Sequence, residues 1–136
     1  MTESRTGEWT WLGEAVVLAM HEDQLSEHGG SVGIRDRGLL QTALAKPTQA
    51  ASYGDPPPDL AALAAAYAHG IARLHPFIDG NKRTSLVAAE TFIDLHGCRL
   101  DATDIECVPI WLALAAGDLD EAELAAWLRG RLRLVD

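Results

Sequence analysis

A ten-residue stretch, HPFIDGNKRT at 75 to 84, combines a histidine, a carboxylate, a glycine, an amide and two cations. Helical periodicity resumes directly after it, so its last residues lie at the start of a helix. The first backbone N–H groups of a helix lack intrahelical acceptors and attract phosphate, and Gly80 lets the backbone approach such a ligand closely. Lys82 and Arg83 add full positive charges where cations are ordinarily unfavourable. That local conflict is typical of a functional site, and we predict that this one binds phosphate.

A carboxylate and a histidine extend the chemistry of this stretch. Mg²⁺ binds through one or two carboxylates together with substrate phosphates, so Asp79 is a candidate metal ligand. Histidine has an ordinary pKa of about 6.5 and accepts a proton from a hydroxyl at cellular pH, so His75 is a candidate base. Arg73, two residues earlier, is near enough to reach a phosphate or a target. Phosphoryl or nucleotidyl transfer requires such a combination of metal ligand, cations and base.

Each of these residues also has a purely structural interpretation. His75 can be a loop or capping histidine, Asp79 and Asn81 can cap the helix that follows, and Arg73 can form a surface salt bridge. His69 lies on an alanine-rich segment, and we expect it to be a packed or half-exposed histidine. No third ligand accompanies these two histidines, so we expect no zinc site.

The overall composition argues against several classes of function. The chain has 136 residues, a net charge of −9 and a pI near 4.9, whereas nucleic-acid binding ordinarily needs a basic face. We therefore expect no direct contact with nucleic acid; cations clustered in an acidic chain indicate a small polyphosphate instead. The N-terminus lacks a signal-peptide pattern and no run of about 18 apolar residues occurs, so we expect a cytoplasmic protein without membrane contact. Cys98 and Cys107 have neither metal-site nor redox spacing.

The pattern of apolar residues predicts the fold class. Alanine and leucine are frequent in a chain that is 48% hydrophobic, and both favour helices. We expect a single all-α domain over 1–136, a compact bundle of six to seven helices with a disordered tail at 1–8. Periodicity and stop signals predict helices at 9–26, 35–45, 59–74, 81–96, 103–116 and from 118 or 120 to 134.

Two of these segments have a further interpretation. The helix at 59–74 is apolar almost all round, which is typical of a central, buried helix. The proline-rich segment 47–58 is expected to be a loop, either a flap that places a target or an ordinary long connection. We expect Arg35, Asp36 and Arg37 to fix the loop between 28 and 47 rather than to take part in chemistry.

The stretch HPFIDGNKRT resembles the signature of the Fic/Doc superfamily, HxFx(D/E)GN(G/K)R, at all of its polar positions. Residues 28 to 47, HGGSVGIRDRGLLQTALAKP, are similar to the segment that precedes the site in the Doc (death-on-curing) branch. The resemblance covers about residues 11 to 133 and implies the Fic/Doc fold. Fic proteins transfer AMP from ATP to a hydroxyl and carry glycine where this chain has Lys82. Doc toxins carry lysine there and phosphorylate elongation factor Tu.

The resemblance implies a role for each residue of the stretch. His75 would be the base and Asp79 the Mg²⁺ ligand, while Phe77 would be the buried anchor of the loop. Four residues would hold the phosphates of ATP, with Arg73 as a further candidate: Gly80, Asn81, Lys82 and Arg83.

The implied function is that of a toxin of a toxin-antitoxin pair that phosphorylates a Ser or Thr of elongation factor Tu and arrests translation. A cognate antitoxin is implied as the partner, with its C-terminal segment bound as a helix in a groove. Two alternatives stay open. Pro76 and Gly80 follow the Fic pattern, so the chain could be an AMP transferase; it could also be a non-catalytic member that binds a nucleotide or a partner.

Overall fold

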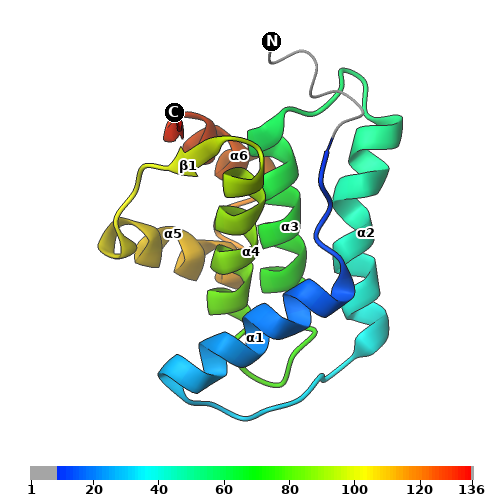
Figure 1. The fold of residues 1–136 in the computed structure, drawn as a ribbon, viewed down its shortest axis with the longest axis vertical. Helices are drawn as coiled ribbons and strands as arrows, with labels where there is room; N and C mark the ends of the chain where they lie inside the picture. Colours follow the sequence, from blue (N-terminus) through cyan, green and yellow to red (C-terminus); the bar gives the residue numbers. More distant parts are fainter. Residues whose placement is uncertain (1–8, 136) are drawn as a thin grey trace.

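The structure, a computed structural model, describes residues 9–135. Within that range the chain folds into a compact all-α bundle of six helices with two short strands (Figure 1), which confirms the predicted fold class. Residues 1–8, where we expected a disordered tail, lie outside the described range. In chain order the elements are α1 (Glu14–His28), α2 (Arg37–Tyr53), α3 (Leu60–Leu74), α4 (Asn81–Leu95), β1 (Cys98–Leu100), α5 (Asp104–Ala116), α6 (Glu121–Arg129) and β2 (Leu132–Leu134).

Helix α3 is the centre of the bundle, as its nearly uninterrupted apolar sequence predicts. It packs against α2, α4, α5 and α6, and eleven of its fifteen residues are buried. Its small alanine side chains allow the neighbouring helices to approach closely. The helix begins at a cap, because the side chain of Asp59 accepts a hydrogen bond of 2.9 Å from the N–H of Ala62. The connection that precedes α3 and the one that follows it lie at opposite ends of the helix bundle (Figure 1).

Helix α1 begins later than predicted, because residues 9–13 are held in an extended conformation by distant parts of the chain. The N–H of Thr10 donates to His96 Nε2 at 2.9 Å, and the N–H of Leu12 donates to the hydroxyl of Tyr67 at 2.9 Å. These acceptors come from α3 and from the end of α4. The prediction of a helix from residue 9 was wrong because helical spacing cannot reveal such tertiary partners.

Helix α2 continues past Pro47 to Tyr53, so the prediction that it ends at residue 45 was wrong. A proline inside a helix removes one hydrogen bond and is ordinarily destabilising. Here Pro47 is buried and Ala50 packs against the core, so burial of this face compensates for the lost bond. The remaining connection, residues 54–59, lies at the end of α3 remote from residues 75–80 (Figure 1). Of our two interpretations, this placement favours an ordinary connection rather than a flap over the site.

The last helix is shorter than predicted, because α6 ends at Arg129 and Gly130 follows it. Residues Leu132–Leu134 instead form β2, which pairs antiparallel with β1 and places Arg133 opposite Arg99. The two helices before β2 begin as their sequences suggest: Thr103 with Glu106, and Asp120 with Glu123, form capping boxes. None of the helices in the described range is long and apolar enough to cross a lipid bilayer.

Candidate active site

The stretch HPFIDGNKRT forms the tight connection between α3 and α4 at one end of the bundle (Figure 1). His75 ends α3 in a left-handed conformation with φ 50° and ψ 58°, and it is the one non-glycine residue with positive φ in the described range. Gly80, with φ 80°, immediately precedes α4. Residues with positive φ thus stand at both ends of the connection, one ending α3 and one preceding α4, and His75 is exposed.

Phe77 and Asn81 brace the interior of this connection. The Phe77 ring is completely buried. The N–H of Phe77 donates to Asn81 Oδ1 and Asn81 Nδ2 donates to the carbonyl of Phe77, both at 3.0 Å. A buried ring whose backbone is hydrogen-bonded in this way can anchor the loop, which is the role expected for Phe77. Both polar atoms of the Asn81 side chain are therefore occupied by hydrogen bonds to Phe77. The group of Asn81 that can donate to a phosphate is its backbone N–H.

His21 of α1 supports the same connection and was not anticipated from the sequence. Its ring is buried and lies parallel to the Phe77 ring, with centroids 3.8 Å apart and an angle of 8°. Its Nε2 lies 2.8 Å from the carbonyl oxygen of Asp79. A carbonyl only accepts hydrogen bonds, so Nε2 carries the proton here. The available signal was its spacing of four residues from Val17 and Leu25, which places a histidine on the buried face of α1.

The carboxylate of Asp79 is fixed by two backbone donors. Gly80 N–H donates to Oδ1 at 2.8 Å, and Ser31 N–H donates to Oδ2 at 3.3 Å. These hydrogen bonds, that from Ser31 above all, lower the pKa of Asp79 below its ordinary value. The loop after α1 comes so close that a Cβ atom at Gly30 would lie 2.8 Å from Oδ2. Asp79 is therefore an ionised, exposed carboxylate at neutral pH.

The first turn of α4 carries the predicted cations on its surface. The first intrahelical bond at this end joins the N–H of Thr84 to the carbonyl of Gly80, so the N–H groups of residues 81–83 have no intrahelical acceptor. Lys82 and Arg83 are exposed. These two cations and the start of α4 follow Asp79 closely in the chain. An anion could bind at the helix start and the cations, and its metal ion could bind at the Asp79 carboxylate.

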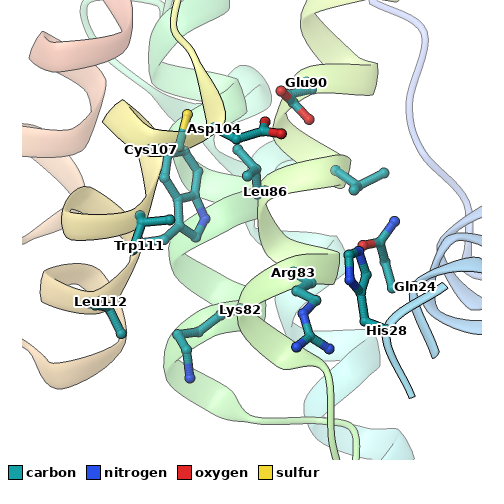
Figure 2. A pocket seen from close by; sticks show the side chains of 12 residues that line it. Gln24, His28, Lys82, Arg83, Leu86, Glu90, Asp104, Cys107, Trp111 and Leu112 are labelled. Carbon is teal, nitrogen blue, oxygen red and sulfur yellow. The ribbon is translucent and has the colours of Figure 1, made fainter. Parts of the chain in front are cut away.

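Lys82 and Arg83 also line a groove of about 350 Å³ between α1, α4 and α5. Figure 2 shows the two cations near the start of α4 and two carboxylates, Glu90 and Asp104, near the other end of the groove. Burial raises the pKa of Glu90, and the nearby charge of Asp104 adds to the effect. Cys107 lies beside them, and burial raises its pKa to about 11. The groove is thus apolar along its length, with opposite charges at its ends.

Arg73 does not join this cluster through any contact that the structure records. Its Nη1 atom occupies the space beside Gly117, where an added Cβ atom would lie only 2.5 Å away. Arg73 therefore extends toward the turn between α5 and α6. His69, on the same helix, is half-buried as expected and lies 3.5 Å from a carboxylate oxygen of Glu121.

The loop before α2 is tied to the motif more closely than the sequence indicated. Asp36 caps α2 through the N–H of Leu39, and Arg37 pairs with Glu14 at 2.9 Å, which agrees with the structural role we expected for them. Arg35 also fixes the loop, because its guanidinium donates to the backbone carbonyls at the end of α3. The sequence did not indicate that the partner of Arg35 would be the motif itself.

Comparisons with known proteins agree with the motif. The model of the Fic/DOC family matches residues 11–93. The protein named "Toxin Doc" of Mycolicibacterium smegmatis is 42% identical over 105 residues, which cover 75% of this chain and 80% of that protein. The protein named "Protein kinase doc" of Escherichia phage P1 is 28% identical over 113 residues, covering 83% and 88% respectively. The signature, the helical fold and these relatives together show that the chain belongs to the Fic/Doc family, in its Doc branch.

Proposed function

We propose that this protein is the toxin of a toxin-antitoxin pair and a kinase that transfers the γ-phosphate of ATP to a Ser or Thr hydroxyl of elongation factor Tu. The observation that carries the proposal is that an ionised carboxylate directly precedes, and two exposed cations lie within, the first turn of α4, whose N–H groups at residues 81–83 have no intrahelical acceptor, while an exposed histidine ends the preceding helix. The names of the two relatives, one a toxin and one a protein kinase, lend support.

The residues at this helix end suit ATP with Mg²⁺. Mg²⁺ prefers carboxylate and phosphate oxygens, and the lowered pKa of Asp79 keeps its carboxylate ionised at neutral pH. The N–H groups of residues 81–83 and the side chains of Lys82 and Arg83 would hold the phosphates. When bound, Mg²⁺ would neutralise phosphate charge during transfer.

His75 would act as the base. Its imidazole takes the proton of the target hydroxyl while the hydroxyl oxygen attacks the γ-phosphorus. The bond between the γ-phosphorus and the β–γ bridging oxygen breaks, and ADP leaves with that electron pair. The phosphorylated side chain and a protonated His75 remain, and His75 returns its proton to water. Lys82 and Arg83 would offset the negative charge on the phosphoryl oxygens throughout.

AMP transfer is the second candidate, because Pro76 and Gly80 follow the Fic pattern. Lys82 favours the kinase, since a lysine in place of glycine fills space and adds charge beside the nucleotide phosphates. Its side chain is exposed at the mouth of the groove (Figure 2), where it can determine which phosphate faces the target.

Labelling with two forms of ATP tests the proposal. The purified protein is incubated with Mg²⁺ and elongation factor Tu, with γ-labelled or α-labelled ATP in parallel. We expect label on the factor from γ-labelled ATP alone, lost in His75→Ala and kept in His69→Ala, a histidine outside the motif that lies near Glu121. Label from α-labelled ATP would establish AMP transfer instead. Label that survives in His75→Ala would refute the role of His75.

We further propose that the cognate antitoxin places an amphipathic helix in the groove between α1, α4 and α5. Helix α5 exposes an apolar stripe, with Ile105, Val108 and Leu112 exposed to 83%, 56% and 53%. Such a stripe at helical spacing suits a partner helix. The opposite charges at the two ends of the groove suit a helix that brings an acidic group to Lys82 and a cation to Glu90.

A matched pair of substitutions tests this surface. Leu112 lines the groove, whereas Leu95 is 49% exposed at the end of α4 and does not line it. Each variant is expressed with the product of the reading frame adjacent to the gene, and the complex is measured after purification. Leu112→Arg should weaken the complex and Leu95→Arg should not. Equal binding by both variants would place the antitoxin elsewhere.

A further inference from the structure

The conformation of His75 calls for a specific support. A left-handed conformation in a non-glycine residue costs on the order of 1 to 3 kcal/mol and persists only where surrounding contacts enforce it. His75 has φ 50° and ψ 58° and precedes Pro76, which restricts its backbone further. The direction of its imidazole depends on this backbone conformation, because the Cα–Cβ bond turns with it.

Arg35 provides that support from the loop before α2. Its Nε donates to the carbonyl of His75 at 2.6 Å and its Nη2 donates to the carbonyl of Leu74 at 2.8 Å. Its backbone N–H donates to the carbonyl of Pro76 at 2.7 Å. One residue thus holds three successive carbonyl groups, with His75 in the middle.

The chemistry of this contact suits arginine specifically. The last carbonyls of a helix lack intrahelical donors and carry partial negative charge. A guanidinium has several donors in a rigid fork and can bind two carbonyls at once, whereas an ammonium is a compact point charge on a flexible chain. The two hydrogen bonds from the charged guanidinium, at 2.6 and 2.8 Å, are of the kind that offsets a backbone cost of about 1 to 3 kcal/mol, and they act on the carbonyls that flank the left-handed residue.

We propose that Arg35 is a positioning residue, which fixes His75 in the left-handed conformation and thereby aims its imidazole at the target hydroxyl. The effect on turnover rests on the proposed role of His75 as the base. The conformational effect does not, and it can be measured without any activity. Arg35 itself touches neither nucleotide nor target in this scheme.

Three variants separate this role from simple loss of charge or of structure. Arg35→Gln removes the fork, and Arg35→Lys keeps the charge without the fork. Arg37→Gln is the matched control, because Arg37 lies two residues away, is 67% exposed and pairs with Glu14 rather than with the motif. Melting temperature and circular dichroism are recorded for each variant to establish that it folds.

The first readout is the NMR chemical shifts of the His75 Cα, Cβ and carbonyl carbons in ATP-free protein. Arg35→Gln should move them away from left-handed values, Arg35→Lys should move them less, and Arg37→Gln should leave them unchanged. Unchanged His75 shifts in Arg35→Gln would overturn the proposal. This result holds even if the wild-type protein transfers no phosphate, so a failure of the proposed function is distinguished from a failure of the positioning role.

The second readout is steady-state labelling of elongation factor Tu. Arg35→Gln should lower kcat about 10- to 100-fold, the effect expected when a catalytic group is misplaced by about 1 Å. The KM for ATP should change less than about twofold, because the phosphate-binding end of α4 is untouched. Partial recovery of kcat in Arg35→Lys is expected. A fall in kcat that accompanies a large fall in melting temperature, with His75 shifts unchanged, would mean a purely structural role and overturn the proposal.

Discussion

Replacement of Asn81 by alanine should destabilise the protein by about 2 to 4 kcal/mol. The side chain of Asn81 satisfies both backbone groups of Phe77, with two hydrogen bonds of 3.0 Å. Phe77 is completely buried, so water is poorly placed to replace those bonds. Each buried polar group left without a partner costs about 1 to 3 kcal/mol; two groups are affected, and because the loop can relax partly after the change we expect the lower part of the sum, about 2 to 4 kcal/mol.

The expected change in melting temperature follows from the length of the chain. At about 2.1 cal/mol/K per residue, the unfolding entropy of 136 residues is about 0.29 kcal/mol/K. The predicted loss therefore lowers the melting temperature by about 7 to 14 °C. Urea unfolding monitored by circular dichroism gives the free energy directly, and differential scanning calorimetry gives the temperature.

Lys82→Ala is the control for this experiment. Lys82 is the next residue of the same helical turn and is exposed, so its loss should leave the melting temperature within about 2 °C, as is usual for surface substitutions. Titration calorimetry with ATP and Mg²⁺ should instead detect weaker binding by Lys82→Ala. If Asn81→Ala keeps its stability and weakens ATP binding as Lys82→Ala does, its side chain contacts the nucleotide and our reasoning about the loop is wrong.

Two further predictions concern Asp79 and the start of α3. Gly30→Ala should weaken binding of ATP with Mg²⁺ in calorimetry, because its Cβ atom would lie 2.8 Å from Asp79 Oδ2. Gly29→Ala is the control, because Gly29 also has a positive φ but an added Cβ atom there would have nothing within 4 Å; equal losses would contradict the steric reasoning. Asp59→Ala should lower the free energy of unfolding by about 1 to 2 kcal/mol at pH 7, because it removes the cap of α3 and an exposed ion pair with Arg129. Asp59→Asn keeps the cap and removes only the ion pair, so it should lower the free energy of unfolding by less than about 1 kcal/mol. The Arg129 hydrogen bond lowers the pKa of Asp59, so its charge-dependent stabilisation is complete above about pH 4 and is lost as the pH falls through the lowered pKa. Urea unfolding of the wild type and Asp59→Asn from pH 7 to pH 2.5 should therefore converge at low pH, and a constant difference would refute the electrostatic explanation.

Much of the candidate site could be predicted because its residues are contiguous. Ten consecutive positions carry the histidine, the carboxylate, the helix-opening glycine and the cations. Phe77 and Asn81, which brace the loop, are also only four positions apart. Local chemistry of this kind is visible in a sequence, since the spacing of side chains along a turn and a helix start is nearly fixed.

The residues that support the site could not be found in this way. His21 reaches Asp79 from 58 positions away, and Arg35 reaches His75 from 40 positions away. Neither residue belongs to a motif that indicates its partner. Their roles follow from the packing of α1 and of the loop before α2 against the connection between α3 and α4.

The sequence by itself determined the fold class, the central position of α3 and the polar residues at the start of α4, because each depends on composition or on neighbouring residues. The tertiary structure alone decided that α2 continues through Pro47, that residues 132–134 pair with 98–100, and that the left-handed His75 is held by Arg35. In these cases burial or hydrogen bonds between distant segments outweigh local preference. Contacts of that kind contribute free energy only after the chain has brought the segments together.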